Sequence, residues 1–109
     1  MMHPKVVTLQ PNDIFDGTTG ITFRQDVTAA IDDGADIILV DCQDIKFMDS
    51  SGLGSLVLAL KAVRATKSQL VLCSLTTQVK TLFHLTEITQ IFQIYENRQH
   101  FEQSELLKL

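Results

Sequence analysis

The sequence contains no long hydrophobic run and no basic leader. Its longest apolar stretch is residues 37–40, with an aspartate on either side, whereas a membrane-spanning helix needs roughly 20 apolar residues. The first ten residues also lack a basic region followed by an apolar core, so we expect no secretory signal. We therefore predict a cytoplasmic protein that does not bind a membrane.

Basic residues are in the minority. Nine Lys and Arg against thirteen Asp and Glu give a formal net charge of −4 at pH 7. Such a charge repels phosphate backbones, so we do not expect direct binding to nucleic acid.

Cysteine and histidine are too few and too scattered for a metal site. Cys42 and Cys73 lie at or near the ends of apolar runs, and neither belongs to a CxxC motif or a histidine ligand pattern. Cytosolic cysteines in such surroundings behave as small hydrophobic residues. We predict two reduced, partly buried thiols, no metal site and no cofactor.

Linkers, internal repeats and low-complexity segments are also missing from the sequence. A chain of 109 residues is long enough for one hydrophobic core but too short for a second. We predict that residues 1–109 form a single domain.

The apolar pattern predicts strands that alternate with helices. Residues 5–10 favour a strand, and turn-forming residues follow at 11–13, so we expect a β-hairpin to open the domain. Thr18 or Thr19 is then expected to cap a helix that ends at Gly34. The apolar residues at helical spacing between them are Phe23, Val27, Ala30 and Ile31.

The continuous apolar run at 37–40 is typical of a central strand that is covered on both faces. Residues 51–67 give the clearest helix, and 70–73 and 91–95 predict two more strands with a helix between them. Asn97 is expected to cap a last helix. This alternation predicts an α/β fold: a mixed, mostly parallel sheet of four or five strands with about four helices. The apolar positions of the three later helices are Leu53, Leu56, Val57, Leu60 and Val63, then Val79, Leu82 and Phe83, then Phe101, Leu106 and Leu107.

The elbow between the buried strand and the clearest helix holds Asp49, Ser50, Ser51, Gly52 and Gly54. The first three are all preferred helix-capping residues. Each glycine lowers helix propensity by ~1 kcal/mol, which indicates that something needs access to the backbone there. Loops after the carboxyl ends of parallel strands commonly carry the functional groups of α/β proteins.

Three nucleotide or catalytic motifs fail at this elbow. A dinucleotide-binding GxGxxG pattern would start at Gly52 but ends in Val57, and the phosphate loop GxxxxGK[ST] and the hydrolase motif GxSxG are absent. No histidine is obviously placed to activate Ser50. We predict that the protein is not an enzyme, and a small-ligand sensor is kept as an alternative.

A phosphorylation site is the third interpretation of the elbow. Phosphate on Ser50 would add about −1.5 to −2 charge at a helix N-terminus. Beside Asp49, this charge would expel a partner that docks against acidic or apolar groups. From these residues alone, simple helix capping is the favoured interpretation, and a covalent switch of partner binding is one of three functional alternatives.

Residues 47–54, Phe-Met-Asp-Ser-Ser-Gly-Leu-Gly, resemble the motif of STAS domains, specifically of bacterial anti-sigma factor antagonists. Residues 72–74, 78–83 and 91–95 extend the similarity over nearly the whole chain. The resemblance implies a switch that binds a serine kinase with anti-sigma activity and so frees a sigma factor, regulating transcription indirectly. It further implies phosphorylation of Ser50 by that kinase and resetting by a metal-dependent serine phosphatase.

One departure from the family pattern lies before the first helix. Antagonists commonly carry Gly-x-Leu-Asp there, whereas this chain has Asp-Ile-Phe-Asp at 13–16, a change that bears on which kinase is bound. A STAS scaffold or a module controlling another signalling output is the alternative function, and a weak homo-oligomer is left open. The partner-binding residues that the resemblance implies are Asp16, Asp49, Ser51, Gly52, Leu53 and Gly54.

Overall fold

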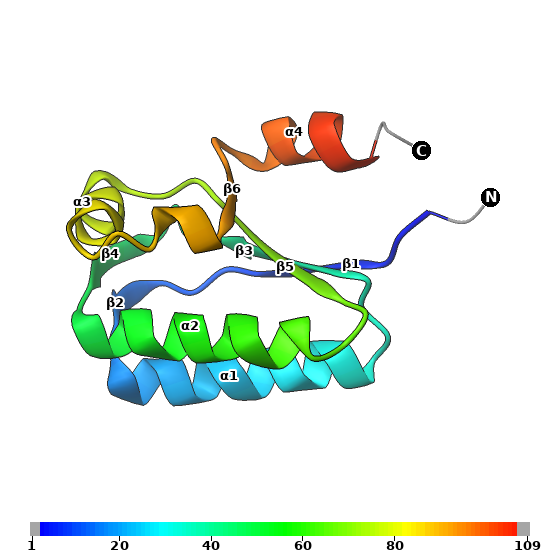
Figure 1. The fold of residues 1–109 in the computed structure, drawn as a ribbon, viewed down its shortest axis with the longest axis horizontal. Helices are drawn as coiled ribbons and strands as arrows, with labels where there is room; N and C mark the ends of the chain where they lie inside the picture. The colour runs from blue at the N-terminus through cyan, green and yellow to red at the C-terminus, as the bar shows by residue number, and fades with distance from the viewer. Residues whose placement is uncertain (1–2, 107–109) are drawn as a thin grey trace.

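The computed structural model describes residues 3–106 as two β-sheets, each made of parallel strands, with helices packed around them (Figure 1). The strands are β1 (Val6–Leu9), β2 (Asp13–Phe15), β3 (Ile37–Asp41), β4 (Ile45–Met48), β5 (Gln69–Cys73) and β6 (Gln93–Tyr95). The helices are α1 (Gly17–Asp32), α2 (Ser50–Arg64), α3 (Thr77–Leu85) and α4 (Arg98–Phe101). A 3-10 turn (Thr89–Ile91) precedes β6, and a π-helix (Glu102–Leu106) continues α4.

The main sheet has the strand order β1-β3-β5-β6, and all its strand pairs are parallel. β3 lies inside this sheet and all five of its residues are buried, as its continuous apolar run predicts. A helix connects each pair of neighbours, because parallel strands need a long crossover. The predicted α/β class with a largely parallel sheet is confirmed.

The predicted opening β-hairpin is wrong. β1 pairs with β3, whereas β2 pairs in parallel with β4, a strand that the apolar pattern did not predict. Val7 and Leu9 of β1 pack against the larger core, so β1 buries more apolar surface in the main sheet than a short hairpin with β2 would provide. Residues 10–12 therefore carry the chain from one sheet to the other.

Helices α1 and α2 cover one face of the main sheet, and α4 lies over the other (Figure 1). The larger core, which includes the buried Phe23, Ile38, Leu56 and Val63, lies under α1 and α2. Successive residues of β3 point to opposite faces, so this strand contributes to both cores. The smaller core is formed by Ile37, Leu39, Val71, Cys73, Tyr95 and Phe101.

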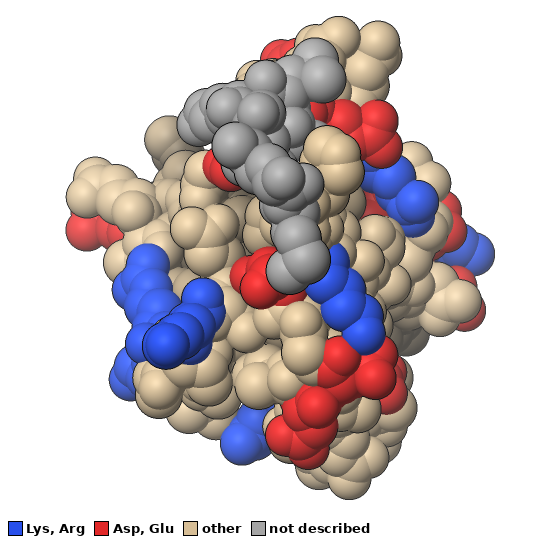
Figure 2. All heavy atoms as spheres, turned by 90° about the vertical axis from the view of Figure 1, so that its right-hand side faces the viewer, with Lys and Arg blue, Asp and Glu red and all other residues tan. Residues whose placement is uncertain are grey.

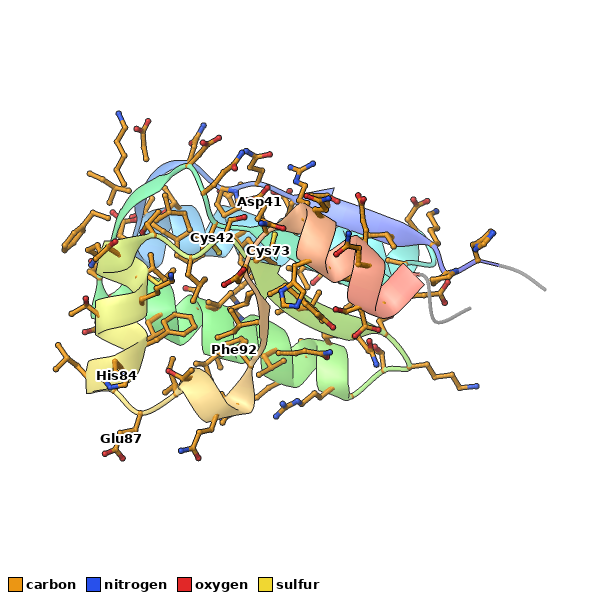
Figure 3. The ribbon with its side chains drawn as sticks, turned by 90° about the horizontal axis from the view of Figure 1, so that it is seen from above. Asp41, Cys42, Cys73, His84, Glu87 and Phe92 are labelled. Carbon is orange, nitrogen blue, oxygen red and sulfur yellow. The ribbon has the colours of Figure 1, made fainter. Side chains whose placement is uncertain are left out.

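An ion pair between a half-exposed arginine and a buried aspartate joins α4 to the end of β3. Asp41 is only 1% exposed, and its Oδ2 accepts a hydrogen bond of 2.6 Å from Nε of Arg98. Asp41, Cys42 and Cys73 lie close together at this end of the sheet (Figure 3). Both cysteines are free, as predicted, but they are fully rather than partly buried, and burial raises the pKa of each thiol.

The boundaries of α1 follow from its caps. Asp16 is the N-cap, not Thr18 or Thr19 as predicted. Gly34 follows the helix as predicted, and its φ of +87° is a conformation that glycine adopts without steric cost.

Later boundaries differ from the prediction by two or three residues. α2 ends at Arg64 instead of residue 67, and the last strand begins at Gln93 because the 3-10 turn occupies 89–91. Asn97 caps α4 as predicted, its Oδ1 accepting from the N–H of His100 at 2.8 Å. Leu107, which was predicted to belong to the last helix, lies outside the described residues.

Charged side chains are unevenly distributed at the end of the molecule where α1 and α2 stop. Figure 2 shows one group of basic side chains apart from the acidic ones on this side, and basic side chains next to acidic ones elsewhere on it. Lys61 and Arg64 lie in the last turn of α2, whereas Asp32 and Asp33 end α1. None of the helices in the described part of the chain is long and apolar enough to cross a membrane.

Candidate functional site

The first turns of α1 and α2 lie against each other at one end of the molecule. A Cβ atom added to Gly17 would lie 3.4 Å from Cβ of Ser51, and one added to Gly20 would lie 2.2 Å from Oγ of Ser55. The two helices run in the same direction (Figure 1), so the positive ends of their dipoles are adjacent. The elbow identified in the sequence lies at this place.

Asp16 caps the first of these helices. Its Oδ1 accepts hydrogen bonds of 3.0 Å from the N–H groups of Thr18 and Thr19, and its own N–H donates to Oγ1 of Thr19 at 2.9 Å. This reciprocal capping box lowers the pKa of Asp16 from its ordinary value of 3.8, chiefly through the bond from the Thr19 N–H. Asp16 is thus a partly exposed, ionised carboxylate beside the elbow.

Asp49 caps the second helix and leaves Ser50 free. Oδ1 of Asp49 accepts a hydrogen bond of 2.8 Å from the N–H of Gly52. Ser50 is the first residue of α2 and is exposed. Within residues 3–106 no hydrogen bond engages the Ser50 hydroxyl, which is therefore open to modification from solvent.

The two glycines of the motif have different surroundings. A Cβ on Gly52 would lie 2.0 Å from the carbonyl oxygen of Phe15, so only glycine fits against the end of β2. Gly54 is exposed, and a Cβ added there would meet nothing within 4 Å. The fold therefore requires Gly52 but does not require Gly54. Gly54 nevertheless occurs in the helix, where glycine lowers stability by ~1 kcal/mol.

The partner-binding residues implied by the family resemblance divide into two sets. Gly52 and Leu53 are buried, and Leu53 packs in the larger core. These two residues support the fold and do not offer a contact surface. The four that reach the surface at this end are Asp16, Asp49, Ser51 and Gly54.

Asp13 stands where the family resemblance leads us to expect a glycine, and its backbone is left-handed. Its φ of +54° lies in the left-handed region, which glycine adopts freely and aspartate tolerates. Asp13 also forms an exposed ion pair of 3.3 Å with Lys46. Aspartate at this position thus combines a backbone conformation typical of glycine with a charged surface side chain.

Gln78 of α3 holds the backbone just before the elbow, a role that sequence reasoning missed. Its Oε1 accepts from the N–H of Met48 and its Nε2 donates to the Met48 carbonyl, each at 2.8 Å. β4 pairs with β2 along one edge, and the Gln78 amide satisfies Met48 on the other edge as a further strand would. The two residues are 30 positions apart, so no local spacing could reveal the contact.

The arrangement favours a negative charge on Ser50 more than it favours catalysis by Ser50. The free N–H groups at the start of α2 and its dipole stabilise an added anion. In the described part of the chain, no hydrogen bond joins the Ser50 hydroxyl to a base that would make it a nucleophile.

A family model for the STAS domain matches residues 2–101. The chain belongs to the STAS domain family. The predicted resemblance is confirmed.

Relatives of this STAS domain include an anti-sigma-B factor antagonist of Listeria monocytogenes. It is 36% identical over 58 residues, which cover 53% of this chain and 51% of the relative. The match thus spans about half the length of this curated relative.

Solved structures share the fold over most of the chain. A crystal structure of a candidate anti-sigma factor antagonist from Thermotoga maritima is 25% identical, with a TM-score of 0.82, and the match covers 92% of this chain and 86% of that one. The antagonist SpoIIAA, unphosphorylated, is 19% identical, with a TM-score of 0.74 and coverage of 95% and 91%. Phosphorylated SpoIIAA from Bacillus is 18% identical, with a TM-score of 0.68 and coverage of 95% of each chain.

The contrast between the two glycines of this STAS domain predicts opposite effects of the same substitution. Gly52→Ala forces a Cβ into the Phe15 carbonyl and should lower the free energy of unfolding by about 1–3 kcal/mol or more. Gly54→Ala should raise it by up to about 1 kcal/mol. Urea unfolding of both variants checks this, and a loss of stability in Gly54→Ala would contradict the assignment.

Replacing Gln78 should loosen the elbow. Gln78→Leu keeps the approximate side-chain volume but leaves the Met48 N–H and carbonyl without their partner, at a cost of about 1–3 kcal/mol. Amide hydrogen exchange at Met48 should quicken by more than the global change in stability explains. Gln90→Leu, at an exposed position, is the matched control, and equal effects of the two variants would refute a specific role for Gln78.

The capping box of Asp16 predicts a component of stability that depends on pH. Because folding lowers the pKa of Asp16, its contribution is present above the ordinary value of 3.8 and is lost as the pH falls through the folded-state pKa. Asn is also a good N-cap, so Asp16→Asn keeps a cap that does not titrate. The difference between the urea midpoints of wild type and Asp16→Asn should shrink in acid, and a difference that is constant with pH would contradict this account.

Proposed function

We propose that this STAS domain is a cytoplasmic anti-sigma factor antagonist that is switched by phosphorylation of Ser50. In this proposal residues 1–109 act as a single regulatory domain with no catalytic activity. The unphosphorylated form binds a serine kinase that is also an anti-sigma factor, and thereby frees a sigma factor.

The main support for this proposal is that the Ser50 hydroxyl is exposed and forms no hydrogen bond in the described part of the chain. Ser50 is exposed, is the first residue of α2 and has no hydrogen bond to its hydroxyl among the described residues. Asp49 has taken the capping role, so phosphorylation removes no contact that the fold needs. The names of the Listeria relative and of SpoIIAA, which was solved with and without phosphate, support the same function.

Electrostatics supports a release of the partner on phosphorylation. A phosphoserine adds about −1.5 to −2 charge to a surface that already carries Asp49 and Asp16. The dipole of α2 tolerates this charge within the domain, whereas an apolar or acidic group on a docked partner does not. Screening confines the effect to about 8–10 Å at physiological salt, so the groups that respond lie at the first turns of α1 and α2.

The switch needs an enzyme for each direction. The kinase partner transfers phosphate from ATP to the Ser50 oxygen, and a metal-dependent serine phosphatase hydrolyses the ester and restores the binding-competent form. The exposed position of Ser50 gives both enzymes access.

The proposal is tested by incubating the purified protein with ATP and the candidate kinases encoded near it. Intact-mass spectrometry then counts the phosphates, and site mapping locates them. We expect one phosphate on Ser50, none on Ser50→Ala, and undiminished phosphorylation of the neighbouring control Ser51→Ala. Ser50→Ala should keep the fold and bind the kinase permanently, and Ser50→Asp should bind it more weakly. Phosphate that persists on Ser50→Ala would contradict the Ser50 assignment and make Ser51 the better acceptor. Self-assembly into a large particle without kinase binding would replace the antagonist with the scaffold alternative.

A further inference from the structure

A groove runs between α1 and α2 on the side of the helices away from the sheet. In Figure 1 these two helices form the outermost layer on their side of the molecule. The groove encloses about 420 Å³. Its walls include Ile21, Arg24, Gln25 and Thr28 of α1 and Ala59 and Ala62 of α2.

Large apolar side chains are exposed along this groove. Ile21, in its wall, is 56% exposed, and Leu58 of α2 is 47% exposed. Leu58 and Ala62 are four positions apart and therefore neighbours on one helix face. Exposed aliphatic side chains that flank a groove mark an interaction surface more often than scattered ones do.

The groove is continuous with the surface around Ser50. Ser51, Gly54, Leu58 and Ala62 follow each other at helical spacing along one face of α2, and all four are exposed. From Ser51 to Ala62 this face is about 16 Å long, at 1.5 Å per residue. A partner bound at Ser50 reaches the groove by following α2 for three turns.

The charge of the groove is opposite to that of the whole protein. The net charge of the chain is −4, yet the charged residue in the groove lining is Arg24, and no acidic residue is part of that lining. Among residues 3–106, Arg24 forms no ion pair. The groove therefore complements a segment that is apolar on one face and acidic along one side.

We propose that this groove binds an amphipathic helix of the kinase that phosphorylates Ser50, with the apolar face against Ile21 and Leu58 and an acidic flank toward Arg24. A groove between two helices fits the side-chain ridge of a third. Gly54, which the fold does not require, lets the partner backbone pass close to α2 between the groove and the phosphorylation site. This inference rests on the proposed function, because it names the docking surface for the same kinase.

Kinetics with the kinase that modifies Ser50 tests the groove. Leu58→Glu and Arg24→Glu should each raise the KM for the STAS domain, and the Kd of the complex, about tenfold or more, because each places negative charge against an acidic, apolar-faced helix. The kcat should change less, since Ser50 itself is untouched. Leu85→Glu is the control at a 77% exposed leucine on α3, and should change either constant less than about twofold.

The possible outcomes distinguish a failure of the groove assignment from a failure of the proposed phosphorylation switch. If wild type is phosphorylated on Ser50 and both groove variants, folded by circular dichroism, behave like Leu85→Glu, the groove assignment is wrong and the switch stands. A Leu58→Glu variant with altered self-association but an unchanged KM would assign the groove to a second copy of this chain and overturn the proposal. If no candidate kinase binds or modifies wild type, the proposed function fails, and the groove assignment, which depends on that kinase, fails with it.

Discussion

The close approach of α2 to the end of β2 determines the geometry of the functional end. Gly52 lies against the Phe15 carbonyl at a separation that excludes any Cβ. The same carbonyl accepts a hydrogen bond of 3.3 Å from the N–H of Asp49. Since Phe15 pairs with Met48 and Gln78 holds Met48 from the other edge, β2 and α3 together fix the two residues that precede Ser50. An exposed side chain thus stands on a backbone with little freedom.

Helix capping and the proposed phosphorylation are compatible at this elbow. Asp, Ser and Ser in succession offer three preferred caps, and a serine engaged in capping would lose its hydroxyl hydrogen bond on phosphorylation. Asp49 accepts from Gly52 and so satisfies the helix start, which releases the hydroxyl of Ser50. The carboxylate that serves the fold is also the charge that makes a phosphate beside it more repulsive to an acidic partner.

Elements with a strong local pattern could be predicted from the sequence. β3 is a continuous apolar run buried at every position, and α2 repeats its apolar residues at helical spacing. β4 has only two buried residues, Ile45 and Met48, separated by two exposed ones, so it fits neither a buried nor an alternating strand. Its existence depends on β2 as a partner, and the pairing of β1 with β3 depends on the crossover through α1. Neither contact has a local signature.

The parts of the candidate site that are contiguous in sequence could be predicted, whereas the contacts between distant residues could not. Ser50 was identified from a contiguous motif, and its exposure agrees with that prediction. The different duties of Gly52 and Gly54 depend on what lies opposite each, the Phe15 carbonyl in one case and open space in the other. Gln78, likewise, reaches Met48 only because α3 packs beside β4.

Several features near Ser50 lower the stability of the isolated domain. Glycine at position 54 disfavours the helix by ~1 kcal/mol without any steric need, and Ile21 and Leu58 leave about half of their surface in water. Scattered over a protein, such features need no explanation. Here Gly54 and Leu58 lie on one face of α2, and Ile21 faces the same groove from α1. These residues make no internal contact that would offset their cost in stability, and they follow one path from the proposed phosphorylation site. A binding partner explains them better than the fold does.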